Sequence, residues 1–129
     1  MLQGKFKRFG LSNYSSWEVA DIVHTCRSNG YIEPSVYQGM YNAITRSVED
    51  ELLPCLQKFG ISFYAYNPLA GGLLSGKHKY EQLESDSIEK GGRFAGSTGW
   101  AVTYKDRFWQ KSKFDGIDIV KNALNEAYG

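Results

Sequence analysis

Residues 63–77 read FYAYNPLAGGLLSGK, and the interpretation of the rest of the sequence depends on this stretch. Apolar and polar positions alternate over 61–66 and aromatic residues are abundant, which predicts a β-strand. Asn67 and Pro68 end the strand, because proline lacks a backbone N–H and restricts the residue before it. Small and cationic residues follow, namely Gly71, Gly72, Ser75, Gly76 and Lys77. Glycine lets backbone amides converge on an anion, so this strand and loop could receive a phosphate-bearing cofactor.

A simpler interpretation of the same stretch is a strand followed by a surface loop, and glycine content alone favours it. The glycine spacing matches neither the Rossmann fingerprint nor a P-loop. The neighbouring segments must therefore decide between a cofactor loop and an ordinary turn.

The composition is that of an ordinary globular protein with one domain at most. The sequence has 129 residues, 42% of them hydrophobic, and a formal net charge of +1. Nucleic acid is excluded as the main partner, because binding to phosphates needs a basic face. The apolar runs are too short to insert into a membrane. Cys26 and Cys55 predict reduced, structural cysteines and a cytoplasmic location, and a disulfide between them is disfavoured.

The first half of the sequence alternates strands and helices. Strands are expected over 6–11, 35–41 and 61–66. A helix should begin at Ser15 or Ser16 with Glu18 completing a capping box, and should end at Asn29-Gly30. A second helix should run from about 47 to 59, kinked or divided by Pro54. This order predicts a parallel sheet with crossover helices.

Polar residues lie near the carboxyl end of each expected strand. They are Ser12, Asn13, Gln38, Tyr66 and Asn67. Each has an ordinary explanation by itself, as a turn former, an edge residue or part of the core. Ligands of parallel sheets collect at the carboxyl ends of the strands, so their shared position favours one binding rim.

The second half of the sequence has a weaker pattern. Residues 77–113 show no strong period and predict a long ordered loop rich in aromatic residues. A last helix should place Ile117, Val120, Leu124 and Tyr128 on one face. His24 is expected in a helix and His78 on the surface, and no histidine or cysteine cluster has the spacing of a metal site.

Several segments together resemble one family. They are GLSNY at 10–14, VYQGMYN at 36–42, the stretch 64–77, GRF at 92–94 and YKDRFW at 104–109. In this order they look like an aldo-keto reductase, closest to the aflatoxin-aldehyde and succinic-semialdehyde reductase subgroup. The resemblance covers almost the whole chain.

The resemblance implies an α/β fold, part of a (β/α)8 TIM barrel that binds NADPH/NADP+ at the carboxyl ends of its strands. Residues 1–129 would supply roughly strands 5 to 7, with their helices and a long rim loop. Ser12, Asn13 and Gln38 would bond the nicotinamide carboxamide, and Tyr66 would stack on its ring. The remaining cofactor-binding positions would be Asn67, Pro68, Leu69, Ala70, Gly71, Gly72, Leu73, Leu74, Ser75, Gly76, Lys77 and Arg93. Tyr104 and Arg107 would contact a small-molecule aldehyde, which the cofactor reduces to an alcohol.

The sequence departs from the family in one important respect. The family's catalytic tetrad lies on the first four strands, which have no counterpart here, so no catalytic residue and no metal ligand is assigned. We therefore expect an oxidoreductase domain that is incomplete at both ends, with open strand edges and no activity of its own. The alternatives are an inactive truncated product and a regulatory subunit related to potassium-channel beta subunits. A homo-oligomer, or a hetero-oligomer with full-length reductase, is also compatible with the sequence.

Overall fold

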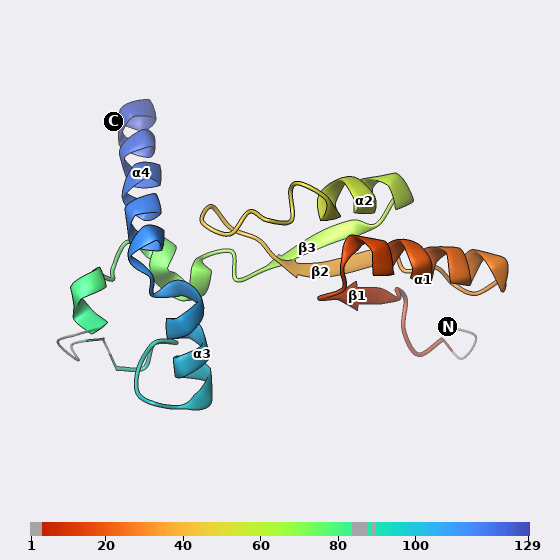
Figure 1. The fold of residues 1–129 in the computed structure, drawn as a ribbon, viewed down its shortest axis with the longest axis horizontal. Helices are drawn as coiled ribbons and strands as arrows, with labels where there is room; N and C mark the ends of the chain where they lie inside the picture. The colour runs from red at the N-terminus through yellow and green to blue at the C-terminus, as the bar shows by residue number, and fades with distance from the viewer. Residues whose placement is uncertain (1–3, 84–87, 89) are drawn as a thin grey trace. The chain divides into compact units, whose positions relative to one another are not determined.

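A computed structural model describes residues 4–83, 88 and 90–129 (Figure 1). The chain forms two compact units. The first consists of Met1–Tyr41 and Arg46–Tyr66, and the second of Asn42–Thr45 and Asn67–Gly129.

The first unit is built on a three-stranded parallel sheet. Its strands are β1 (Gly10–Ser12), β2 (Val36–Met40) and β3 (Ser62–Tyr66), in the order β1-β2-β3. The expected parallel pairing is confirmed. Strand β1 begins later in the sequence and is shorter than the strand expected over residues 6–11, because only residues 10–12 pair with β2.

Two helices cover one face of this sheet, α1 (Ser16–Ser28) and α2 (Leu52–Phe59). Leu11, Tyr37 and Phe63 are register partners on that face. They pack with Val19 of α1 and Leu56 of α2 to form the core. Burial of these side chains stabilises the packing of both helices against the sheet. Neither α1 nor α2 covers the opposite face of the sheet.

The N-terminus of α1 carries the expected capping box. Glu18 Oε2 accepts hydrogen bonds from the Ser15 backbone N–H at 2.8 Å and from the Ser15 hydroxyl at 2.7 Å. These bonds, the backbone one first, hold the pKa of the Glu18 carboxyl below its usual value. At the other end, Gly30 has φ 65°, as expected for a helix stop.

Helix α2 begins at Leu52 rather than near residue 47. Pro54 therefore lies in its first turn and does not kink or divide it. Proline is tolerated there because the first-turn N–H groups have no partner within the helix. Turns occupy residues 48–51, where an earlier helical start was expected.

The second unit contains more helix than the sequence predicted. Two short 3₁₀ helices, η1 (Ala70–Ser75) and η2 (Tyr80–Leu83), precede α3 (Gly99–Phe108) and α4 (Lys111–Tyr128). The loop expected over residues 77–113 is wrong where α3 lies, and its residues 84–87 and 89 are outside the described part of the chain. Thr98 caps α3, its Oγ1 accepting a hydrogen bond from the Ala101 N–H at 3.3 Å.

An aromatic cluster forms the core of the second unit. Phe94 and Phe108 are fully buried, and Trp109 is nearly so. His78 makes edge-to-face contacts with the rings of Phe94 and Trp109, each at 5.4 Å between centroids. His78, expected on the surface, is half-buried, because these ring contacts hold it against the aromatic core.

Three parallel strands with helices on one face are consistent with part of an aldo-keto reductase barrel. Their assignment as strands 5 to 7 stays a prediction. Cys26 and Cys55 are free, as expected. Among the described residues, we find no helix with the length and apolar character needed to cross a membrane.

Candidate functional site

The first unit brings two of the expected nicotinamide-binding residues together. Ser12 at the end of β1 and Gln38 in β2 are register partners. They lie on the sheet face opposite α1 and α2, and both side chains are exposed. A hydroxyl and a carboxamide side by side can donate to and accept from a planar amide.

Asn13 and Tyr66 form a second contact at the same end of the sheet. The Tyr66 hydroxyl donates a hydrogen bond to Asn13 Oδ1 at 2.8 Å. Asn13 directly follows β1 and has φ 60°, a conformation that asparagine tolerates better than most residues. The four expected nicotinamide-binding residues, Ser12, Asn13, Gln38 and Tyr66, thus occupy the carboxyl-end half of the sheet.

In the second unit, three hydrogen bonds fix Asn67, the first residue of the glycine loop (residues 67–77). Its main-chain oxygen accepts from Asn42 Nδ2 at 3.0 Å and from the Ala70 N–H at 2.9 Å. Its Oδ1 accepts from the Tyr104 hydroxyl at 3.0 Å. With φ 52°, Asn67 turns the chain sharply into the loop.

Asn42 is a residue that sequence reasoning missed. It is 7% exposed, and its Oδ1 accepts a hydrogen bond from the Ile44 N–H at 3.0 Å. Its position two residues after β2 could have indicated it, because an asparagine just after a strand often forms a side-chain hydrogen bond with nearby backbone groups. Its contact with Asn67 could not be found this way, because it joins distant parts of the sequence.

The backbone of the glycine loop is compact. Gly71, Gly72 and Gly76 have φ values of 71°, 113° and 74°. The N–H groups of Ala70, Gly72, Leu74 and Gly76 donate to carbonyls within the loop. These four amides therefore have internal acceptors here. Beyond the Cα atoms of Gly72 and Gly76 the space is open, so a ligand can approach the backbone closely at these positions.

Two exposed cations accompany the loop. Lys77 ends it, and Arg93 is held over the Tyr104 ring with its guanidinium carbon 5.3 Å from the centroid. Arg93 Nη1 also lies 3.4 Å from the Tyr104 hydroxyl. Tyr104 itself is only 7% exposed, whereas Arg107, one turn further along α3, is exposed. The structure thus brings Asn67, Arg93 and Tyr104 together.

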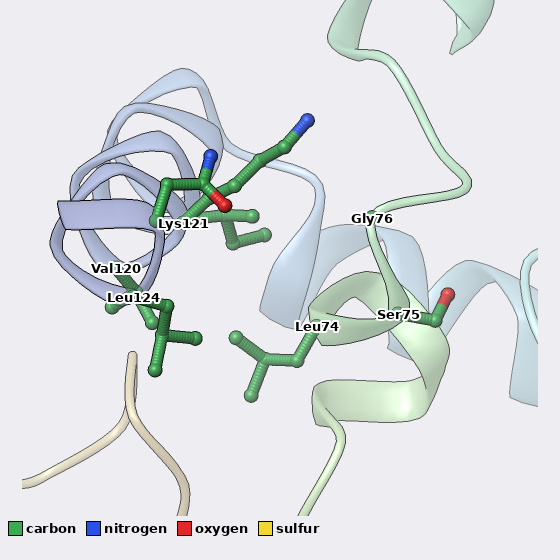
Figure 2. A pocket seen from close by; sticks show the side chains of 8 residues that line it. Leu74, Ser75, Gly76, Val120, Lys121 and Leu124 are labelled. Atoms are coloured by element: carbon green, nitrogen blue, oxygen red, sulfur yellow. The ribbon is translucent and has the colours of Figure 1, made fainter. Parts of the chain in front are cut away.

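A pocket of about 270 Å³ lies between the end of η1 and α4 (Figure 2). Leu74 and Leu124 point toward one another across it. Ser75, Gly76, Lys121 and Asn125 supply polar groups to its lining. The Ser75 hydroxyl donates to the Gly72 carbonyl at 2.6 Å, which stabilises the fold of the loop rather than leaving the hydroxyl for a ligand.

The described part of the chain contains no group of three or more His, Cys, Asp or Glu side chains arranged to hold a metal ion. The carboxyl-end rim of the first unit offers amides and hydroxyls, which suit a ligand that carries a carboxamide. The glycine loop of the second unit is accompanied by a lysine and an arginine, which suit a ligand that carries phosphates.

Comparison with known proteins adds the decisive observation. The model of the aldo/keto reductase family matches residues 1–123. The chain belongs to the aldo-keto reductase family. This confirms the resemblance inferred from the sequence, and the comparisons support its subgroup as well.

Similar aldo-keto reductases include two human proteins. The chain is 60% identical over 127 residues to aflatoxin B1 aldehyde reductase member 2 of Homo sapiens, covering 98% of the chain and 34% of that protein. It is 58% identical to aldo-keto reductase family 7 member A3 of Homo sapiens, covering 98% and 38%. An aldo-keto reductase of Pseudocercospora fijiensis is 42% identical, covering 92% and 38%. The chain thus spans about a third of the length of these relatives.

Proposed function

We propose that this chain forms the nicotinamide- and diphosphate-binding part of an NADPH-dependent aldehyde reductase. Ser12, Asn13 and Gln38 would bond the carboxamide, and Tyr66 would stack on the nicotinamide ring. The observation that carries the proposal is that Ser12 and Gln38 are register partners on one sheet face, next to the Asn13–Tyr66 hydrogen bond at the carboxyl ends of β1 and β3. Ligands of parallel α/β sheets bind at these ends.

The glycine loop and its cations would hold the diphosphate. Gly72 and Gly76 leave open space next to the backbone, and Lys77 and Arg93 supply positive charge. Four loop amides already have acceptors within the loop, so we assign most of the phosphate affinity to these two side chains. Arginine is well suited to this task, since its planar group can bond a phosphate through two N–H groups.

When bound, the cofactor supplies the hydride that reduces an aldehyde to an alcohol. The residues of this chain would fix the exposed face of the nicotinamide ring by bonding its carboxamide and packing against its plane. Arg107, an exposed cation on α3, would attract aldehydes that carry a carboxylate.

We assign no proton donor to this chain. The hydroxyls of Tyr66 and Tyr104 both donate to asparagine oxygens, so each already has an acceptor. The relatives are about three times longer, and the remaining length would supply the acid in a complete enzyme. Two free cysteines are compatible with a cytoplasmic location.

The direct test is a titration of the purified chain with NADPH, comparing wild type with Ser12→Ala and Gln38→Ala. Each substitution removes hydrogen bonds to the carboxamide and should weaken binding by roughly 2- to 10-fold. Ser62→Ala is the matched control, because Ser62 is exposed on β3 at the amino end of the sheet. Absence of saturable binding, or equal weakening by all three variants, would contradict the proposal.

A further inference from the structure

We propose that Tyr104 is a positioning residue that holds the glycine loop and Arg93 in the geometry needed for the cofactor diphosphate. This inference rests on the proposed function of the loop. It differs from the expectation that Tyr104 contacts the substrate, because the structure turns its hydroxyl toward other protein groups.

The Tyr104 side chain touches three of the positions assigned to the cofactor. Its hydroxyl donates to Asn67 Oδ1 at 3.0 Å, at the start of the glycine loop. The same hydroxyl lies 3.4 Å from Arg93 Nη1, and the ring lies under the Arg93 guanidinium. At Gly71, an added Cβ would lie 2.7 Å from Tyr104 Cδ1, so the ring packs directly against the loop backbone.

These contacts explain how a buried tyrosine can influence an exposed anion site. Asn67 has φ 52°, a backbone conformation that costs a non-glycine residue free energy and is retained where the surroundings support it. The hydroxyl fixes the asparagine, and the ring restricts the glycine. The cation–π contact limits the rotamers open to the arginine, which reduces the entropy lost when it bonds a phosphate.

Burial separates this role from direct substrate contact. Tyr104 is 7% exposed and packs edge-to-face on Phe94, which is fully buried. Its hydroxyl proton is engaged by Asn67, so it has no second proton to offer a carbonyl. Arg107 stays available as a substrate contact, because it is exposed on the same helix.

The test compares Tyr104→Phe, Asn67→Gly and the double variant. Tyr104→Phe keeps the ring against Gly71 and removes only the hydroxyl. Asn67→Gly removes Oδ1 and still permits the positive φ. Tyr80→Phe is the control, because it removes a tyrosine hydroxyl in the same unit and keeps the ring contact with Phe114.

The first readout is amide hydrogen exchange at Gly72 and Gly76, measured without cofactor, and it needs no binding activity. Tyr104→Phe and Asn67→Gly should each speed exchange by roughly 2- to 10-fold. The double variant should exchange no faster than Asn67→Gly, since both substitutions break the same bond. Exchange at Val23, in the other unit, should not change. If the amides of Gly72 and Gly76 exchange in Tyr104→Phe at the same rate as in wild type, the inference is overturned.

The second readout is the dissociation constant of NADPH, which separates this inference from the proposed function. Tyr104→Phe should raise it by roughly 2- to 10-fold, while Tyr80→Phe leaves it unchanged. If wild type binds NADPH and Tyr104→Phe binds equally well, the positioning role is wrong and the proposed function stands. If wild type fails to bind, the proposed function is wrong, and loop exchange alone decides whether Tyr104 positions the loop.

Discussion

The Tyr66 hydroxyl donates a 2.8 Å hydrogen bond to Asn13 Oδ1, and this bond joins the two outer strands of the sheet. β1 and β3 are not neighbours, since β2 lies between them. The bond therefore spans β2 at the carboxyl-end rim. It sets the orientation of the Tyr66 ring, the group proposed to lie against the nicotinamide.

Tyr66→Phe should weaken NADPH binding by roughly 2- to 10-fold, because the ring remains but its orientation is no longer fixed by the hydroxyl. Tyr64→Phe is the matched control on the same strand and the same sheet face. It removes only a 3.4 Å bond from Arg8 to an exposed hydroxyl. Fluorescence titration with NADPH measures both. Equal affinities for the two variants would show that the bond to Asn13 has no part in binding.

Gly71→Ala should destabilise the second unit by about 1–3 kcal/mol. The residue has φ 71°, and the added Cβ would approach Tyr104 Cδ1 to 2.7 Å and Phe94 Cζ to 3.0 Å. Gly99→Ala in α3 is the control, because it meets nothing within 4 Å and lies in a helix, where alanine is favoured. Urea unfolding measures both changes. A Gly71→Ala variant as stable as Gly99→Ala would contradict the packing described here.

Asn42→Ala should lower the free energy of unfolding by about 1–3 kcal/mol. The substitution leaves the Asn67 main-chain oxygen and the Ile44 N–H without the hydrogen bonds that the buried Asn42 side chain provides. Asn29→Ala serves as the comparison, because Asn29 donates to the Thr25 carbonyl from an exposed position. Asn29→Ala should lower the free energy of unfolding by less than Asn42→Ala. Thermal unfolding followed by circular dichroism gives the difference, and the reverse ranking would refute the role given to Asn42.

Acid should destabilise the first unit partly through Glu49. The pKa of its carboxyl is lowered from 4.5 to about 2, first by hydrogen bonds from Arg46 and then by one from Tyr41. A depressed carboxyl pKa contributes stability above pH 4.5, and this contribution is lost as the pH falls toward 2. The measurement is the drop in melting temperature between about pH 6 and about pH 2.

In this measurement, Glu49→Gln should show a smaller drop than wild type, because glutamine keeps its acceptor oxygen at every pH. Ser62→Ala, which removes no carboxyl from the first unit, should keep the wild-type drop. An unchanged drop in Glu49→Gln would show that the bonds to Arg46 and Tyr41 do not stabilise the fold.

Local patterns predicted the first unit well. Ser15 and Glu18 indicated a helix start, and the structure shows both hydrogen bonds of Glu18. The alternating residues of β3 indicated a strand within one residue of its observed start. These features depend on neighbours a few residues apart, so the sequence displays them directly.

The errors arose where distant contacts decide the structure. Helix α3 buries Ala101, Tyr104 and Phe108, but the exposed Trp100 immediately before them hides the period. His78 is more buried than a surface residue, because its ring contacts residues 16 and 31 positions away in the sequence. The bonds of Asn67 to Asn42 and Tyr104 likewise join segments that no local pattern connects.

The most direct test of the central proposal is an NMR titration of the isotope-labelled chain with NADPH. We expect shifts to saturate for the backbone amides of Asn13, Gln38 and Tyr66, and for the glycine loop and Arg93. Amides on the exposed side of α1, such as that of Asp21, should not shift. Saturable shifts confined to helix surfaces such as α1, or no saturable shifts at all, would contradict the assignment of this chain as the cofactor-binding part of an aldehyde reductase.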